Sequence, residues 1–74
     1  MNEAQVEVQS YAQKLMLQGE RNTYMALSAM CEKMLLESVH LPDGEERTQL
    51  QHDIRGNLSF CRNKAELLQG RIGD

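Results

Sequence analysis

The sequence has no tryptophan, one proline and only three aromatic residues, Tyr11, Tyr24 and Phe60. β-Sandwiches and β-barrels depend on aromatic and β-branched strands separated by frequent turns, so this composition argues against both. Basic residues are also few, since eight lysines and arginines against eleven acidic residues give a formal net charge of −3. Because phosphate contacts from basic side chains dominate affinity for nucleic acids, we expect no nucleic-acid partner.

Long apolar runs and a basic N-terminal segment are both missing. A membrane span needs about 20 apolar residues, and a signal peptide begins with basic residues, whereas this chain begins Met1-Asn2-Glu3. We therefore expect a soluble, cytoplasmic protein without a membrane span. The two cysteines, Cys31 and Cys61, are fewer than a small secreted domain usually carries. We expect both to be reduced.

The sequence also lacks the residue patterns of a metal site or an enzyme. Its cysteines and histidines (Cys31, His40, His52, Cys61) form no C-x₂-C or H-x₃-H pair, so we expect no metal. A hairpin folded about residue 41 would separate the cysteines by roughly 15 Å along its axis, too far for a disulfide. There is no nucleophile with a base and no Gly-rich phosphate loop. We expect no catalytic residue, no cofactor and no enzymatic activity.

Apolar residues recur at helical spacing along one predicted domain, residues 1–74, which places the chain in the all-α class. A first helix over about 3–18 carries the stripe Ala4, Val8, Tyr11 and Leu15. A second helix over about 23–38 carries the stripe Tyr24, Leu27, Cys31, Met34 and Ser38. Leu15 and Tyr24 are about 2.5 helical turns apart, so the two stripes would face opposite sides of one straight helix. This phase jump predicts a break at 19–23.

Pro42 predicts the end of the second helix, because proline removes a backbone donor and moves the preceding residue out of the helical region. Asp43 and Glu46 then resemble a capping box at the start of a third helix over about 44–72. Gly56 interrupts this helix, either at a tolerated cost of about 1 kcal/mol or at a close helix crossing. The third helix carries the most regular stripe, namely Leu50, Ile54, Leu58, Cys61, Ala65, Leu68 and Ile72.

The expected architecture is an antiparallel helical hairpin within a three-helix bundle whose third helix is long. That helix would project about a dozen residues, on the order of 18 Å, beyond its neighbours. The projecting end would carry Ala65, Leu67, Leu68 and Ile72. Either the first two helices form one bent rod that covers this end, or another polypeptide covers it.

Methionine is abundant in and beside the second helix, where apolar residues surround most of the circumference. Methionine fills irregular gaps in cores, and it also forms adaptable binding surfaces, so both interpretations stay open. On the second interpretation the chain binds another protein through apolar helical surfaces, in a homo- or hetero-oligomer such as a dimer. The candidate partner-binding residues are then Met25, Ala29, Met30, Met34, Ala65, Leu67, Leu68 and Ile72.

Three short segments carry a family resemblance: Cys31-Glu32-Lys33-Met34-Leu35-Leu36, the turn Pro42-Asp43-Gly44, and Thr48-Gln49-Leu50-Gln51. Over about residues 24–70 the chain resembles the small helical co-chaperones that hold needle subunits in type III secretion systems. The resemblance implies an acidic helical hairpin with a Gln- and Leu-rich second arm. That family tends to place a tyrosine just after the turn, where this chain has Arg47-Thr48.

A second set of residues is Tyr24, Ala26-Leu27, Arg47, Leu50, Ile54 and Ala65-Glu66-Leu67. These residues resemble the signature of microtubule-interacting and trafficking domains, three-helix modules that receive helical tails of membrane-remodelling subunits. The interval from Ile54 to Ala65 is about one turn longer than in that family. Either resemblance implies a groove that accepts an amphipathic helix through anchors at i, i+3, i+4 and i+7. We favour the chaperone, and the rival from another class is a structural homodimer or small inhibitory regulator.

Overall fold

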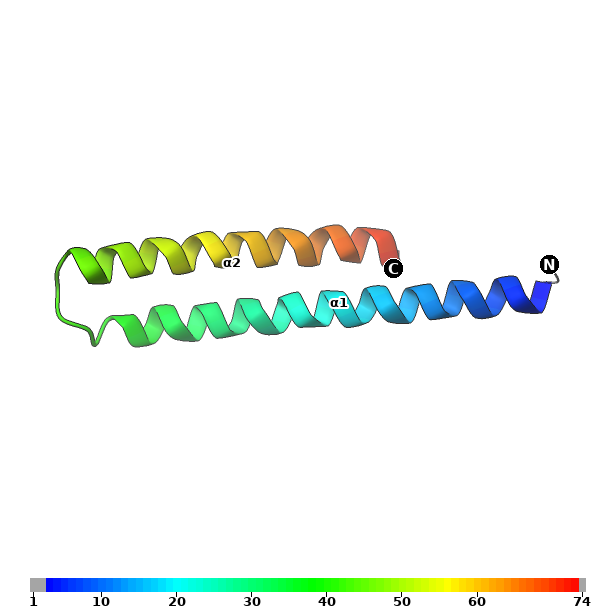
Figure 1. Cartoon of the computed structure of the whole chain (residues 1–74), viewed down its shortest axis with the longest axis horizontal. Coiled ribbons are helices and arrows are strands. Elements are labelled where there is room, and N and C mark those ends of the chain that lie inside the picture. Colours follow the sequence, from blue (N-terminus) through cyan, green and yellow to red (C-terminus); the bar gives the residue numbers. More distant parts are fainter. Residues whose placement is uncertain (1–2, 74) are drawn as a thin grey trace.

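The computed structural model describes residues 3–73 and consists of two antiparallel helices (Figure 1). Helix α1 spans Glu3–Ser38 and helix α2 spans Glu45–Ile72. Together they form a rod of 63 × 18 × 15 Å, and residues 3–73 include no strand. The predicted all-α class is confirmed, and so is the antiparallel hairpin, whereas the three-helix bundle is wrong.

Helix α1 runs without interruption through residues 19–23, so the predicted break there is wrong. The hydroxyl of Thr23 caps no new helix and instead donates to the carbonyl oxygen of Gly19, one turn earlier, at 3.0 Å. The prediction assumed that Leu15 and Tyr24 contact the same neighbour. Because α2 contacts only the later part of α1, the two stripes can face different sides of one straight helix.

The turn predicted from Pro42 is confirmed, since no helix covers 39–44. The capping box at the start of α2 is wrong, because no side chain caps this helix. Asp43 instead pairs with the Arg47 guanidinium at 3.0 Å. Thr48 binds the carbonyl oxygen of Gly44 through both its backbone N–H and its hydroxyl.

The overhang belongs to α1 and not to the C-terminal helix (Figure 1). The helices have 36 and 28 residues, which correspond to about 54 and 42 Å. Leu68 and Ile72 are only 6% and 9% exposed, so their predicted projection is wrong. Of the two alternatives for this end, the structure has the one in which the first two predicted helices form a single rod, here one continuous helix, that covers it. We call residues 3–16, which precede the contact with α2, the arm. Within residues 3–73, neither helix combines the length and the hydropathy that crossing a membrane requires.

Candidate partner-binding surfaces

The contact between the two helices, here called the seam, has the spacing of a coiled coil. Its residues recur at alternating intervals of three and four, which keeps one stripe of each helix facing the other. On α1 these buried or half-buried residues are Leu17, Arg21, Tyr24, Ser28, Cys31, Leu35 and Ser38. On α2 they are Arg47, Gln51, Ile54, Leu58, Cys61, Ala65, Leu68 and Ile72. Gln18 and Gln69 are also half-buried and lie at the edge of the seam.

The seam confirms the predicted stripe of α2 from Ile54 onward, whereas Leu50 is exposed. On α1 the stripe is only partly right. Tyr24, Cys31 and Ser38 lie in the seam as predicted, but Leu27 and Met34 do not. Their places are taken by the next residues along the chain, Ser28 and Leu35. Hydrophobicity therefore did not decide which side of α1 contacts α2.

Polar side chains occupy several seam positions and bond to one another. Arg21 donates through Nη1 to Oε1 of Gln69, and Gln51 donates through Nε2 to Oγ of Ser38 at 2.9 Å. In residues 3–73 every buried side-chain nitrogen or oxygen has a partner. Among the described residues, the buried hydrophobic side chains all belong to α2, and the buried residues of α1 are two serines. The apolar surface of α1 is thus largely unused by the hairpin.

The register of the seam places the two cysteines closer than expected. An ion pair joins Glu32 to Arg62, the residues that directly follow Cys31 and Cys61. The prediction assumed that the hairpin folds about residue 41. Because Ser38 contacts Gln51, the midpoint of the hairpin lies later in the chain, and this shift brings Cys31 and Cys61 to nearly the same level. Both thiols are free. Residues 3–73 contain no cluster of three histidine, cysteine or acidic side chains arranged to hold a metal ion.

One side of the hairpin presents exposed apolar residues from both helices, and we call it the apolar face. It comprises Leu27, Met30, Met34 and Leu41, contributed by α1 and the turn, with Leu50, Phe60 and Leu67 from α2. Two shallow depressions lie along it. The first joins Met34 and Leu41 to Leu50, and the second joins Tyr24 to Leu67. The spacing of seven residues between Leu27 and Met34 keeps these two on one side of the seam, and Leu41 of the turn lies beside Met34 in the first depression.

Aromatic contacts fix the middle of the apolar face. The rings of Tyr24 and Phe60 meet edge to face, with centroids 6.2 Å apart and planes at 75°. This is a favoured arrangement for aromatic pairs. The Lys64 ammonium lies 5.7 Å from the centroid of Phe60, within the range of a cation–π contact. A positive charge therefore borders an apolar surface that is held in place from both helices.

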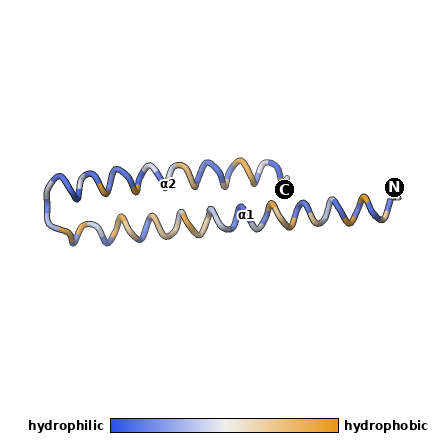
Figure 2. Tube along the Cα trace, viewed as in Figure 1, coloured by the Kyte–Doolittle hydropathy of each residue, from blue (hydrophilic) through white to orange (hydrophobic). Residues whose placement is uncertain are grey.

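The opposite flank of the hairpin is apolar on α1 alone. A depression there brings Met25 and Ala29 of α1 beside the charged residues Arg62 and Glu66 of α2. Helical spacing places these two α1 residues on one line with the apolar residues of the arm. We call this line the α1 stripe: Ala4, Val8, Tyr11, Leu15, Met25, Ala29 and Leu36, all exposed. Figure 2 shows hydrophobic positions continuing along the arm beyond the end of α2.

The residues predicted from the sequence to bind a partner lie on three different surfaces of the structure. Met30, Met34 and Leu67 lie on the apolar face, whereas Met25 and Ala29 lie on the α1 stripe. The remaining candidates are in the seam, where Ala65 is half-buried and Leu68 and Ile72 are buried. Sequence reasoning did not nominate Leu27, Leu41, Leu50 or Phe60. The spacing of seven residues between Leu27 and Met34 was the signal available for Leu27.

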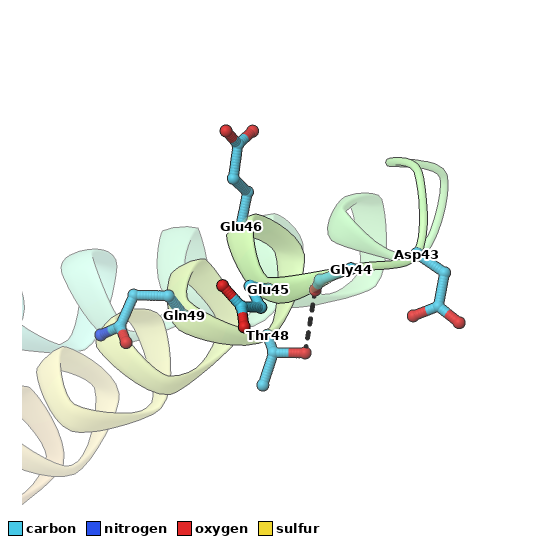
Figure 3. Close-up of a pocket in the computed structure, with 6 residues that line it drawn as sticks. All are labelled: Asp43, Gly44, Glu45, Glu46, Thr48 and Gln49. Carbon is cyan, nitrogen blue, oxygen red and sulfur yellow. Dashed lines mark hydrogen bonds between the residues drawn. The ribbon is translucent and has the colours of Figure 1, made fainter.

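A further open depression lies beside the first turn of α2 (Figure 3). It is lined by Asp43, Gly44, Glu45, Glu46, Thr48 and Gln49. The carboxylates of Asp43 and Glu46 point in different directions and share no common centre (Figure 3). The only bond drawn among these residues is the one from the Thr48 hydroxyl to the Gly44 carbonyl oxygen. The depression offers no convergent set of ligands.

No protein-family model matches this chain, and neither a curated protein nor a solved structure is significantly similar to it. The functional argument therefore depends on the surfaces of the hairpin themselves.

Proposed function

We propose that this chain is a non-enzymatic interaction module that binds an amphipathic helix of another protein on the apolar face. The proposal depends on one observation, namely that most large apolar residues of α1 are exposed while polar residues of α1 are buried against α2. The buried residues of α1 are two serines, while Leu27, Met30 and Met34 remain exposed beside apolar residues of α2. A contiguous exposed apolar surface of this kind is typical of a protein-binding site.

The dimensions of the apolar face suit one helix. On α2 the face extends from Leu50 to Leu67, seventeen residues of one helix, or about 25 Å, which is nearly five turns of a bound helix. Tyr24 and Ser38, which line the two depressions, are fourteen residues apart on α1. A partner helix would therefore need apolar anchors at i, i+3 or i+4 and i+7 that continue to i+14 in order to reach both depressions. Flexible methionine side chains allow such a surface to adjust to the anchors. The complex would be a three-helix bundle whose third helix comes from the partner.

Charges beside the apolar face restrict the orientation of the partner. Lys64 and Arg71 line the depression on the α2 side, and Glu20 lines the same depression from α1. Glu37 lies beside the other depression. A partner helix with acidic residues toward α2 and basic residues toward α1 would pair with both rows. Such complementarity contributes to orientation and association rate more than to affinity.

Within this function we favour a chaperone of the type III secretion class, with a helix of a needle subunit as the bound segment. The two-helix hairpin supports this alternative, because it is the fold that the co-chaperone resemblance implies. A microtubule-interacting and trafficking domain is disfavoured, since that family needs a third helix of its own. Covering the apolar residues of a partner before assembly is the chaperone role that this surface would serve.

The test begins with site-specific photo-crosslinking in the native cell. A photo-reactive residue at Leu27 is expected to crosslink to one partner segment with helical apolar spacing, which mass spectrometry would identify. The same residue at Lys33, away from the apolar face, is the matched control. A synthetic peptide of the captured segment is then titrated against the purified chain. We expect the peptide to gain helicity by circular dichroism as it binds.

Substitution of Met34 by Glu provides the decisive comparison. Met34 is exposed, so the charge should leave the hairpin folded but oppose burial by a partner helix. We expect at least a tenfold loss of peptide affinity in Met34→Glu and little change in Lys33→Glu. Equal affinity for all three proteins would show that the peptide does not occupy the apolar face and would overturn the proposal.

A further inference from the structure

The arm extends past the end of the other helix. Helix α2 ends at the level of Leu17, so residues 3–16 of α1 lie beyond the contact with α2. Its apolar residues are largely uncovered, with Val8 and Tyr11 68% and 66% exposed. The arm continues the long helix α1, so its apolar residues form an exposed stripe on an established helix. Exposed apolar surface of this kind is typical of a contact surface.

The α1 stripe provides a surface of matching pattern. Its arm residues recur at intervals of four, three and four, and the same alternation continues along α1 when the polar residues Gln18, Asn22 and Glu32 are counted with the apolar ones. Two copies of such a stripe can therefore pack against each other in antiparallel orientation. We infer that this chain forms a two-fold symmetric dimer in which the two α1 helices pack antiparallel along the α1 stripe. The arm of each copy then lies beside the hairpin of the other.

Polarity selects one register among the possible antiparallel alignments. With the two-fold axis near Glu20, Gln18 of one copy lies opposite Asn22 of the other, so that the two amides can hydrogen-bond. The apolar layers on either side pair Leu15 with Met25, Tyr11 with Ala29, and Ala4 with Leu36. In each of the last two layers a large residue meets a small one, which favours close packing. Registers shifted by one heptad set Gln18 or Asn22 against apolar residues.

One layer in this register is mixed, because Val8 lies opposite Glu32. The Glu32 carboxylate already pairs with Arg62 across the seam of its own copy. Its methylene groups can therefore contact Val8 while the charged end stays with Arg62.

Charge complementarity supports the same register. Glu7 and Lys14 precede the seam residue Arg21 by fourteen and seven residues, so they continue the side of α1 that faces α2. In an antiparallel dimer that side of the arm points toward α2 of the other copy. Glu7 is then level with Arg55 and Lys14 is within reach of Glu66. Both pairs have opposite charge and occur twice by symmetry.

The surface area buried in the dimer distinguishes this register from one in which only the two arms overlap. An overlap from Ala4 to Leu36 is about 50 Å long, and a helix is about 10 to 12 Å wide, so each copy contributes roughly 500 to 600 Å². The total of about 1,000 to 1,200 Å² reaches the size of a biological interface. Overlap of the arms alone would bury less than half of that. The longer overlap is therefore the one that can hold two copies together.

The first experiment measures self-association of the full chain by sedimentation equilibrium. We expect a reversible dimer for the wild type and at least a hundredfold weaker association for Leu15→Glu, since the symmetric interface contains the substitution twice. Leu15 does not contact α2, so circular dichroism should show an intact hairpin. Leu27→Glu, on the apolar face, is the matched control and should associate like the wild type. A wild-type monomer at all concentrations, or dimerisation unaffected by Leu15→Glu, would overturn the inference.

The second experiment tests the register. Gln18→Cys/Asn22→Cys should give an intermolecular disulfide between these two positions on mild oxidation, as mapped by peptide mass spectrometry. Val8→Cys/Tyr11→Cys reports the arm-only register, and crosslinking only in this variant would refute the longer overlap. Glu7→Arg should weaken the dimer about tenfold, and Arg55→Glu in the same chain should restore it. Peptide binding to the apolar face is measured separately, so either proposal can fail while the other stands.

Discussion

Leu67 and Leu68 form the sharpest test of the hairpin, because they are adjacent leucines in one helix with opposite environments. Leu68 lies in the seam and is 6% exposed, whereas Leu67 lies on the apolar face and is 65% exposed. The substitutions Leu67→Asp and Leu68→Asp introduce the same charge into the same turn of α2. Both variants therefore lose the same helix propensity on replacing leucine by aspartate. The two variants differ only in how deeply the substituted side chain is buried.

The expected magnitudes follow from this difference in burial. Full burial of a leucine side chain stabilises a protein by about 1.5 to 3 kcal/mol, and Leu68→Asp loses nearly all of this. Placing a carboxylate in the seam adds the cost of a poorly solvated charge, for a total of about 3 to 5 kcal/mol. Leu67→Asp loses only about a third of the stabilisation from burial, because Leu67 is mostly exposed. The new carboxylate would lie one turn from Lys64, which lines the same depression. We expect a cost of about 1 kcal/mol or less there.

Urea denaturation followed by circular dichroism measures both free energies of unfolding. A core in a chain of this size rarely supplies more than about 3 to 5 kcal/mol. Leu68→Asp should therefore be largely unfolded in buffer, while Leu67→Asp should unfold cooperatively near the wild-type midpoint. Leu68→Ala, which adds no charge, is the control for the burial term alone and should cost about 2 to 3 kcal/mol.

Two outcomes would contradict this reasoning. If Leu68→Asp were as stable as Leu67→Asp, the end of α2 would not pack against α1, and the register of the seam would be wrong. If both variants unfolded, Leu67 would be covered in solution. The second outcome would be compatible with the hairpin only if self-association used the apolar face, which sedimentation of Leu67→Asp would reveal.

Three further predictions concern the helices and their ion pair. Gly56→Ala should stabilise the chain by about 1 kcal/mol and raise the Tm by about 4 to 8 °C, because an added Cβ would meet no atom within 4 Å. Gly73→Ala is the control and should not stabilise, since φ is 75° there. Backbone chemical shifts should be helical through residues 19–23 and non-helical over 39–44; a helical break at Gly19 would refute the continuous α1. Glu32→Gln should cost less than about 1 kcal/mol in thermal melts, because the ion pair with Arg62 is exposed.

The sequence predicted α2 well because its most regular apolar stripe is also the one that contacts α1, although Leu50, Phe60 and Leu67 are exposed. The stripe from Ile54 to Ile72 is both the hydrophobic stripe and the contact surface, so periodicity and burial coincide. Pro42 added an unambiguous turn. Gly56 left two interpretations open, and the absence of any atom near its missing Cβ excludes a close helix crossing within the described chain.

Helix α1 was predicted less well because it has apolar residues on several sides. Periodicity identified Leu27 and Met34 as the inner stripe, yet the contact with α2 uses Ser28 and Leu35. The apparent phase jump near Gly19 arose from comparing residues that serve different surfaces. A single sequence shows that a helix has apolar stripes, but it does not show which stripe its own chain covers. For the same reason, the predicted partner-binding residues combined residues of the apolar face and of the α1 stripe with residues that are buried in the seam.

The arrangement of α1 links the proposed surfaces energetically. The seam contains few buried hydrophobic residues, all from α2, so the hairpin alone has little stability in reserve. Any molecule that binds only the folded hairpin raises its stability by mass action. A partner helix on the apolar face and a second copy on the α1 stripe both require α1 to be helical. Because each binding event reduces the ordering that the other requires, the two should strengthen one another although they use opposite flanks of the same helix.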